Sequence, residues 1–444
     1  MAVVRKTNST IQNLSGHAVH DWYRFVLAYP DHLVSEMLER FGIRPGQVVL
    51  DPFVGTGTTL VECKRLGIDS IGIDANPFAV FASRVKTTWN IDLAEFDRQR
   101  EALLRYLREA LAELGDAITF QRSFADLLSG EPPPPDLPLP VAEPVADLDA
   151  MKALIPAGAI SDLPLRKVLL ARQAIDALPG GEVSDLFRLA LAAVAVLDMS
   201  NLGFGPEVYV RARKRRDADL HAALVSKLSK IRDDLAAMQE IVAPGTAAVF
   251  AGDARQLAEI VDRPVDCVIM SPPYPNEKDY TRITRLELVL FEFIRDRGDL
   301  RALKEDMLRS HTRNIFKADD DSRFVADIPE IQALAHQIER ARTERGATSG
   351  FERLYHRVVT EYFGGMFRVL DALQQVVAPG GKLAIVVGDQ MSYFQVPIRT
   401  AELLSLLACR KLAFREVETR LWRTRLATAT RREVEEHILI LERC

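Results

Sequence analysis

Short apolar runs, each bounded by glycine, proline or acidic residues, recur towards both ends of this 444-residue chain. Such runs of about four to eight residues predict buried strands. We expect strands at residues 47–51, 69–74, 246–251, 265–270, 382–389, 417–423 and 437–441. Helical patterns separate most of these runs, whereas no helix separates the last two. The pattern predicts an α/β fold with a doubly wound, mostly parallel seven-stranded sheet and an antiparallel edge strand.

Helical periodicity interrupts the strands after residue 74. It predicts helices at residues 93–114, 151–176, 184–198 and 220–242. Residues 129–149 are rich in proline and are expected to form an exposed linker, and residues 200–205 a loop. Residues 91–245 are therefore expected to be a mostly helical insertion. After residue 270, helices are expected at residues 284–296, 298–308, 328–345, 351–377 and 398–409.

The segment Ser271-Pro272-Pro273-Tyr274 directly follows the run at 265–270. Two consecutive prolines cannot continue a strand, because each lacks an N–H group and has a fixed φ. The strand is expected to end in a rigid loop at the carboxyl edge of the sheet, where open α/β sheets bind their ligands. This loop offers a hydroxyl, a backbone carbonyl and an aromatic ring. These groups suit a planar base that carries an exocyclic amino group.

A glycine-rich turn follows the first strand, in the order Asp51-Pro-Phe-Val-Gly-Thr-Gly-Thr-Thr59. Gly55 and Gly57 permit a tight turn and a close approach of the backbone to a ligand, and the helix behind them favours an anion at its N-terminus. Leu60 stands where a dinucleotide fingerprint would place its third glycine, and no lysine follows Gly57 as it would in a P-loop. A tight turn without a ligand remains the alternative for this motif alone.

Acidic residues end three successive predicted strands, namely Asp51, Asp74 and Asp253. Asp74 lies roughly twenty residues beyond the glycines, the spacing at which a carboxylate can accept hydrogen bonds from ribose hydroxyls. Each acid by itself could instead cap the helix that follows it. Three acids at successive strand ends favour a ligand site.

Together these motifs resemble those of the S-adenosylmethionine-dependent DNA amino-methyltransferases. The turn from Asp51 is similar to that family's cofactor loop, usually Asp-Pro-Phe-x-Gly-Ser-Gly-Thr. Ser271-Pro-Pro-Tyr is similar to its catalytic motif, in the Ser form often seen in cytosine-N4 enzymes. Residues 271–288 are similar to a subgroup of bacterial modification methylases, and residues 20–41 to the segment that covers the methionine end of the cofactor. The resemblance covers residues 16–90, 247–295 and 378–443, and it implies a Rossmann-like class I methyltransferase fold.

The resemblance also implies roles for individual residues. The expected cofactor-binding residues are Tyr29, Pro30, Asp51, Phe53, Gly55, Gly57, Thr58, Asp74, Asp253 and Ala254. Among them, Asp51 orients the loop or the cofactor's amino group, Asp74 accepts from the ribose hydroxyls, and Asp253 accepts from the amine of adenine.

The expected catalytic residues are Ser271, Pro272, Pro273 and Tyr274. The Ser271 hydroxyl and the Pro272 carbonyl accept from the target amino group and free its lone pair, while Tyr274 stacks on the base. A target in duplex DNA has to be flipped out to reach this loop.

The formal net charge is −5, so the positive charge that a DNA-binding enzyme needs is expected to be local. The runs 211–216 and 309–317 are the favoured basic segments, ahead of a third at 420–432. The expected DNA contacts are Arg211, Arg213, Lys214, Arg215, Arg216, Arg309, His311, Arg313 and Lys317. For each run, a solvated basic face is the alternative.

The chain is divided into five parts on this basis. Residues 1–90 are expected to hold an N-terminal lid and the first half of the methyltransferase domain, and residues 91–245 the insertion. The other parts are 246–296 with the catalytic loop, a helical and loop segment at 297–360, and the C-terminal part at 361–444. Either 91–245 or 297–360 could carry the DNA-recognition region, because many family members have the two motifs in the opposite order.

Other patterns narrow the class of protein. The four cysteines form no C-x-x-C pair and none follows a proline, so neither a metal site nor the nucleophile of a cytosine-C5 methyltransferase is expected. No apolar stretch has the length of a membrane span, and the first residues lack the apolar core of a signal peptide. A cytoplasmic location without a membrane partner is expected.

The expected activity is site-specific transfer of a methyl group from S-adenosyl-L-methionine to the N4 amino group of cytosine in double-stranded DNA. A restriction endonuclease encoded nearby is the partner that a modification role implies. Adenine-N6 methylation is the first alternative, because a serine at 271 does not exclude adenine. An RNA (tRNA) amino-methyltransferase and a non-catalytic DNA-binding specificity subunit are the others. RNA enzymes more often carry Asp-Pro-Pro-Tyr, and two intact motifs argue against a non-catalytic role.

Overall fold

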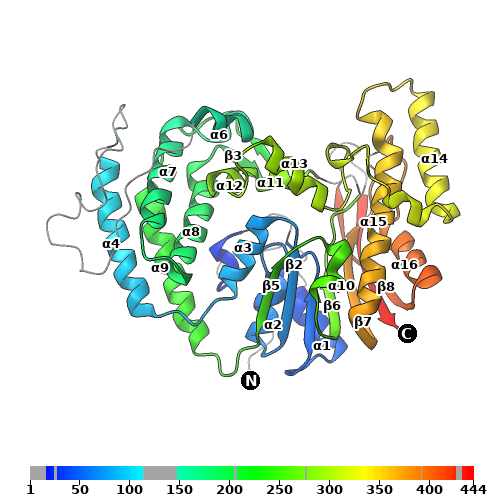
Figure 1. The fold of residues 1–444 in the computed structure, drawn as a ribbon, viewed down its shortest axis with the longest axis horizontal. Coiled ribbons are helices and arrows are strands. Elements are labelled where there is room, and N and C mark those ends of the chain that lie inside the picture. The colour runs from blue at the N-terminus through cyan, green and yellow to red at the C-terminus, as the bar shows by residue number, and fades with distance from the viewer. Residues whose placement is uncertain are drawn as a thin grey trace.

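The computed structural model describes residues 17–24, 28–112, 114, 148–204, 208–275, 278–391, 393–426 and 433–444. At its centre lies a seven-stranded sheet in the order β5-β2-β1-β6-β7-β9-β8 (Figure 1). Its strands are β1 (Val48–Asp51), β2 (Asp69–Asp74), β5 (Ala247–Ala251), β6 (Val265–Met270), β7 (Val377–Gly388), β8 (Phe414–Leu426) and β9 (Glu433–Arg443). The first five pair in parallel, and β9 runs antiparallel to both β7 and β8. The predicted fold class is confirmed.

The order of the strands reverses at the middle of the sheet. β2 and β5 lie on one side of β1, and β6 pairs with its other side through Val49 with Cys267 and Leu50 with Val268. Ligands of open α/β sheets bind outside the carboxyl ends of the strands at such a switch point. Asp51 and Ser271 stand at or just beyond the ends of these two neighbouring strands.

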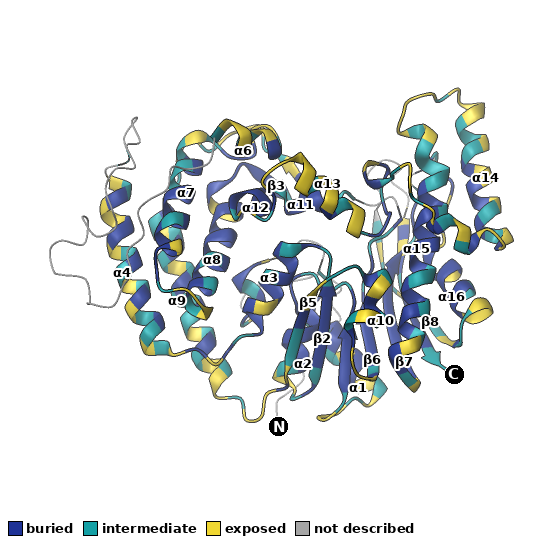
Figure 2. Cartoon of the chain, viewed as in Figure 1, coloured by how far each residue is buried: buried dark blue, intermediate teal, exposed yellow. Residues whose placement is uncertain are grey.

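Helices cover both faces of the sheet, and the central strands β1, β2, β6 and β7 are largely buried between them (Figure 2). One face packs on α1 (Asp31–Phe41) and α2 (Thr58–Arg65). The other face packs on α10 (Leu257–Ile260), α15 (Tyr355–Val376) and α16 (Thr400–Lys411), with α14 (Pro329–Glu344) outside α15. α14, α15 and α16 correspond to the helices predicted at 328–345, 351–377 and 398–409.

The insertion is helical, as predicted, and it shares a core with the sheet domain. Its helices are α4 (Leu93–Ala112), α6 (Leu148–Leu154), α7 (Asp162–Asp176), α8 (Glu182–Val194) and α9 (Leu220–Gln239). They form one apolar cluster with Trp22, with α3 (Pro77–Lys86) and with α12 (Arg285–Leu290). Of the proline-rich linker predicted at 129–149, residues 129–147 lie outside the described residues.

Two predictions within the insertion were wrong. The helix at 151–176 is split, because α6 ends at Leu154 and Gly158 has a φ of +73° before α7 begins. Within the loop expected at 200–205, residues 202–204 form the strand β3 (Leu202–Phe204), which pairs antiparallel with β4 (Val208–Val210). Asn201 stabilises both features: its side chain donates to the Gly158 carbonyl (3.0 Å) and accepts from the Arg215 N–H (2.7 Å). The secondary structure of this region therefore depends on contacts between segments that are distant in the sequence.

The segment after the catalytic loop is more broken than predicted. The short helix α11 (Tyr280–Ile283) comes before the region of the helix predicted at 284–296. Within that region only α12 is helical, and it ends before a turn where Glu292 has a φ of +60°. α13 (Arg297–Asp306) follows.

Among the described residues, no helix combines the length and apolarity needed to cross a membrane.

Candidate active site

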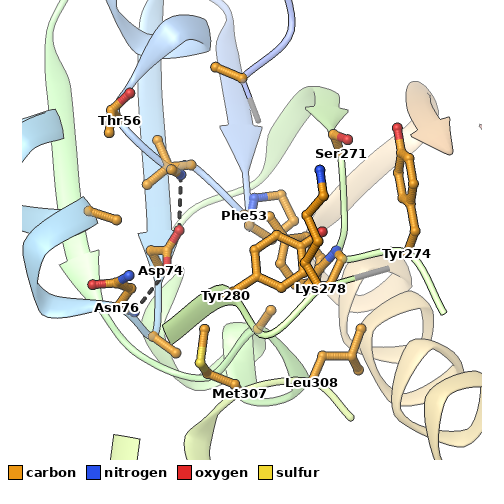
Figure 3. A pocket seen from close by; sticks show the side chains of 18 of the residues that line it. Phe53, Thr56, Asp74, Asn76, Ser271, Tyr274, Lys278, Tyr280, Met307 and Leu308 are labelled. Carbon is orange, nitrogen blue, oxygen red and sulfur yellow. Dashed lines mark hydrogen bonds between the residues drawn. The ribbon is translucent and has the colours of Figure 1, made fainter. Parts of the chain in front are cut away.

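A cavity of about 290 Å³ lies at the carboxyl edge of β1, β2, β5 and β6. In Figure 3, Asp74 and Asn76 lie on one side of it and Ser271 and Tyr274 on the other, with Phe53 between them. The glycine-rich turn and the Ser271–Tyr274 loop thus meet in one cavity, although they are far apart in the sequence.

Most of the expected cofactor-binding residues line this cavity. These are Tyr29, Phe53, Gly55, Thr58, Asp74, Asp253 and Ala254. Pro30, Asp51 and Gly57 do not line it. Pro30 is buried at the start of α1, whereas Gly57 has a φ of +86° and a Cβ there would lie 3.2 Å from the Ser83 backbone. Gly57 is therefore required by the close packing of the turn on α3.

Asp51 stabilises the glycine-rich turn through hydrogen bonds of its buried carboxylate. It is buried, and its Oδ2 atom accepts from the hydroxyls of Tyr29 (2.8 Å) and Thr59 (2.6 Å), while Oδ1 accepts from the Phe53 N–H (3.1 Å). Burial raises the pKa of Asp51 to about 6, although these hydrogen bonds act to lower it. Of the two roles considered for Asp51, orienting the loop fits this position.

Asp74 supports the same turn from the end of β2. Its carboxylate accepts from the Gly55 N–H (2.9 Å) and from the Asn76 N–H (2.8 Å) and also lines the cavity (Figure 3). The Asn76 side chain in turn caps α3 and donates to Thr284 (2.9 Å). Each carboxylate oxygen of Asp74 accepts one of these hydrogen bonds, and its other lone pair can accept from a hydroxyl group of a ligand.

Asp253 is engaged by a neighbouring arginine. The Nε of Arg255 donates to both of its carboxylate oxygens (3.0 and 2.8 Å), and Arg255 also pairs with Asp321 (2.7 Å). Asp51, Asp74 and Asp253 each accept the N–H of the residue two positions later, as in Asx turns. All three acids therefore stabilise a local turn. Asp74 and Asp253 also line the cavity, whereas Asp51 does not.

The N-terminal segment is locked onto the sheet domain by buried polar contacts. The Tyr23 hydroxyl donates to Glu287 of α12, and His20 contacts Glu62 of α2 (2.9 Å). Burial lowers the pKa of Lys86 to about 7, and its Nζ donates to the carbonyls of His20 (3.1 Å) and Tyr23 (2.7 Å). The segment that leads to Tyr29 is thereby held beside the cavity.

The Ser271–Tyr274 loop is fixed against β7. The Ser271 hydroxyl donates to the Val386 carbonyl (3.1 Å), which uses its proton and leaves its oxygen lone pairs as acceptors. The ring of Tyr274 lies against Gly388, where a Cβ would come within 2.9 Å of it. Ser271, Pro273 and Tyr274 line the cavity, whereas Pro272 is buried and does not.

Several residues that line the cavity were not anticipated as site residues. They are Asn76, Lys278, Tyr280, Met307, Leu308, Arg423, Arg425 and Glu436. Glu436 of β9 is buried and pairs with Arg423 and Arg425 of β8, and Arg425 lies 5.8 Å from the Tyr274 ring centre. Arg423 and Arg425 belong to the basic run that was ranked third, whereas no sequence signal marks Glu436.

The expected DNA contacts in the two favoured basic runs differ in how far their side chains are exposed. Arg309 is removed from the candidate DNA contacts, because it is 5% exposed, pairs with Asp319 (2.9 Å) and donates to three backbone carbonyls. Arg215 is half-buried and donates to the carbonyls of Leu197 and Ser200. Arg211 and His311 are also half-buried, and exposed positions are held by Arg213, Lys214, Arg216, Arg313 and Lys317.

Comparison with known proteins agrees with this arrangement. Residues 6–83 match the N6/N4 DNA methylase family. The Type II methyltransferase M.BsoBI of Geobacillus stearothermophilus is 24% identical over 416 residues, which cover 85% of this chain and 75% of that protein. These matches support an S-adenosylmethionine-dependent DNA amino-methyltransferase of the N4/N6 type. The Type II methyltransferase M.AvaI of Anabaena variabilis is 22% identical to this amino-methyltransferase, over 87% of its chain and 77% of the relative.

The cofactor of this amino-methyltransferase family is S-adenosyl-L-methionine, and the cavity fits it. A cavity of about 290 Å³ is near the lower end of the roughly 300–1,000 Å³ usual for small-molecule sites. Its acidic residues Asp74, Asp253 and Glu436 suit hydroxyl, amine and sulfonium groups, and Phe53 and Leu308 offer apolar walls. Asp74, Gly55 and Tyr29 would hold the ribose and methionine portions, and the cofactor when bound supplies an activated methyl group.

Cofactor affinity is expected to fall as the pH is lowered through about 6. Burial raises the pKa of Asp74 to about 6, although the N–H groups of Asn76 and Gly55 act to lower it. Ribose hydroxyls donate to the ionised carboxylate, so protonation competes with binding, whereas affinity is flat above pH 7. The loss approaches tenfold per pH unit below the pKa.

Calorimetric titration with S-adenosylmethionine from about pH 5 to 8 measures this dependence. The Asp74→Asn variant should bind more weakly and lack the slope. A flat wild-type profile would contradict the prediction, and a slope retained in Asp74→Asn would assign it to Asp51, whose pKa is raised to a similar value.

Proposed function

We propose that this amino-methyltransferase methylates the N4 amino group of cytosine in double-stranded DNA, with the target base flipped out of the helix. The observation that carries the proposal is the shared cavity: Ser271 and Tyr274 line it together with Asp74 and Gly55. A donor held by the glycine-rich turn would lie next to a base held by the Ser271–Tyr274 loop. Adjacent binding of both reactants supplies most of the catalytic effect that methyl transfer needs.

The chain's own groups prepare the base amino group for attack. Ser271 donates its proton to Val386, so its oxygen is oriented as an acceptor for an amino N–H. A hydrogen bond from the amino group to this oxygen draws the nitrogen towards a tetrahedral geometry and frees the lone pair, whereas the Pro272 carbonyl, expected as the second acceptor, belongs to a residue that does not line the cavity. Tyr274 provides a stacking face. No strong base is needed before attack, because the amino proton becomes acidic once the methyl group is transferred.

Arg425 supports cytosine as the target. It belongs to the wall beside Tyr274, with its guanidinium carbon 5.8 Å from the ring centre. The guanidinium lies over the Tyr274 ring, so a base that enters the cavity beside this ring would have guanidinium donors within reach. Cytosine offers two acceptors there, O2 and N3, whereas adenine offers only N1 on the corresponding edge.

The Type II relatives support a modification role, in which methylation protects DNA from a restriction endonuclease encoded nearby. Nucleoside mass spectrometry of DNA from a strain that expresses the chain tests the base assignment. We expect N4-methylcytosine, with less of it in a strain that expresses Tyr274→Ala at the same level. Accumulation of N6-methyladenine instead would overturn the cytosine assignment in favour of the adenine-N6 alternative.

A further inference from the structure

Part of the cavity wall comes from a segment that lies far along the chain from the glycine-rich turn. Residues 306–308, at and just after the end of α13, line the cavity together with residues 253–255, which follow β5. In Figure 3, Met307 lies on the side of the cavity that holds Asp74, away from Tyr274. A segment that was considered for DNA recognition therefore contributes to this cavity.

The order of the strands places the adenine end of the cofactor beside these residues. Along the carboxyl edge of the sheet the strands follow one another as β6, β1, β2 and β5. The catalytic loop follows β6, the glycine-rich turn follows β1, and Asp74 ends β2. A cofactor with its methyl group at the catalytic loop and its ribose at Asp74 extends next over the end of β5. Its adenine therefore reaches residues 253–255 and 306–308.

Asp253, the expected acceptor for the adenine amine, has its acceptor positions filled by Arg255. Its Oδ1 atom accepts from the main-chain N–H (2.9 Å) and from the Nε (3.0 Å) of that arginine. Its Oδ2 atom accepts from Nε (2.8 Å) and lies 2.7 Å from Nη2. A carboxylate has about four lone-pair positions, so Asp253 has little capacity left for a donor from a ligand.

Asp306 is a neighbouring acid without such a partner. Its carboxylate forms no hydrogen bond or ion pair with any residue that the structure describes. Asp306 is exposed and also lines the cavity, so its carboxylate stands where the cavity meets solvent. Partial burial raises the pKa of Asp306 and the charge of Asp253 raises it further, while Arg255 acts to lower it. These two charges act on Asp306 because it stands at the same end of the cavity, and a hydrogen bond from a ligand would stabilise its ionised form.

Arg255 ties the main chain before Asp306 to the end of β5. Its Nη1 atom pairs with Asp321 (2.7 Å), and its Nη2 atom donates to the Glu305 carbonyl (3.2 Å). The Arg255 side chain is 9% exposed and also pairs with Asp253. Because these bonds are charge-assisted and mostly buried, they favour a single geometry. The carboxylate of Asp306 is thereby presented to the adenine end of the cavity.

We propose that Asp306 accepts a hydrogen bond from the exocyclic amine of the cofactor's adenine and so distinguishes adenine from purines that lack this amine. Asp253 then acts as a positioning residue, which holds Arg255 in place. Met307 supplies a polarizable apolar surface for the adenine ring. The inference concerns the cofactor and does not depend on the target base, so finding N6-methyladenine in the product would leave it standing.

Two compounds that differ only at the amine test this assignment. S-adenosylhomocysteine is compared with its purine-riboside counterpart, in which a hydrogen atom replaces the exocyclic amine. Binding of each compound is measured by calorimetry at pH 8, so the readout needs neither DNA nor methyl transfer. For wild type, we expect the counterpart to bind about tenfold more weakly, the scale of a lost hydrogen bond to a charged group.

The Asp306→Ala variant should bind S-adenosylhomocysteine about tenfold more weakly and should bind the two compounds about equally. Asp306→Asn should keep only part of the preference, because its amide oxygen can still accept but carries no charge. Glu305→Ala is the matched control, since it removes an adjacent acid whose side chain pairs with Arg301 and does not line the cavity. It should leave both affinities unchanged.

Asp253→Asn separates the two acids. It should retain the preference for the amine, because Arg255 remains paired with Asp321. An undiminished preference in Asp306→Ala would overturn the proposal, and its loss in Asp253→Asn at the same time would assign the amine to Asp253. Equal binding of the two compounds by wild type would also overturn it. If Asp306→Ala failed to fold, as judged by its unfolding temperature, an undiminished preference in Asp306→Asn would refute the proposal equally.

Discussion

Replacement of Asp74 by alanine is expected to raise the dissociation constant of S-adenosylmethionine about 10- to 100-fold, since hydrogen bonds to a charged group contribute about 1.5–3 kcal/mol. The change removes the acceptor proposed for the ribose hydroxyls. It also removes the partner of the Gly55 N–H (2.9 Å), so the turn that faces the cofactor loses an anchor. Calorimetric titration at pH 8 measures the effect with the carboxylate fully ionised.

Asp262→Asn is the matched control, because Asp262 is exposed in the loop before β6, away from the carboxyl edge of the strands. It should bind the cofactor as wild type does. Wild-type affinity in Asp74→Ala would contradict the proposed cofactor site. A loss of folding can be distinguished by the unfolding temperature, which should remain near that of the wild type if the effect is on binding.

Replacement of Tyr274 by alanine is expected to lower kcat/KM for DNA by about 5- to 150-fold, which corresponds to the roughly 1–3 kcal/mol of a base–aromatic stack. Cofactor affinity should change less than about twofold, because the residues proposed to hold the cofactor lie on the other side of the cavity. Methyl transfer from radiolabelled cofactor to DNA gives the first quantity, and calorimetry gives the second.

Tyr274→Phe separates the ring from the hydroxyl and should retain most of the activity. Unchanged turnover in Tyr274→Ala would exclude stacking. An equal loss in Tyr274→Phe would point instead to the hydroxyl, whose pKa is raised by burial and by the Glu436 carboxylate, while Ser271, Arg425 and Arg423 act to lower it.

The sheet could be predicted from the sequence because each strand is short, apolar and bounded by breakers. The run that ends at Asp51 and the run that precedes Ser271 are fully or almost fully buried, and burial on both faces produces a continuous apolar pattern. The position of both motifs at the carboxyl edge then followed from the parallel pairing. The same local signals could not separate the roles of Asp51 and Asp74, since each also accepts the N–H of the residue two positions later.

Other features depended on contacts across the chain. The hairpin of β3 and β4 is supported by Asn201, which contacts Gly158 and Arg215. Arg309 lies in a basic run that looks exposed in sequence, yet its guanidinium is buried against Asp319. Neither partner is visible in a local pattern.

The amino-acid order alone determined the fold class, the two loops that face each other and the kinship with DNA amino-methyltransferases. These depend on hydrophobic periodicity, on proline and glycine geometry and on motifs that occupy consecutive residues. Only the tertiary structure decided which charges are accessible. The buried Glu436 of β9 and Tyr274 of the catalytic loop, for example, line one cavity although they come from segments far apart in the sequence. Burial and electrostatic crowding are properties of distances in space, which spacing along the chain does not encode.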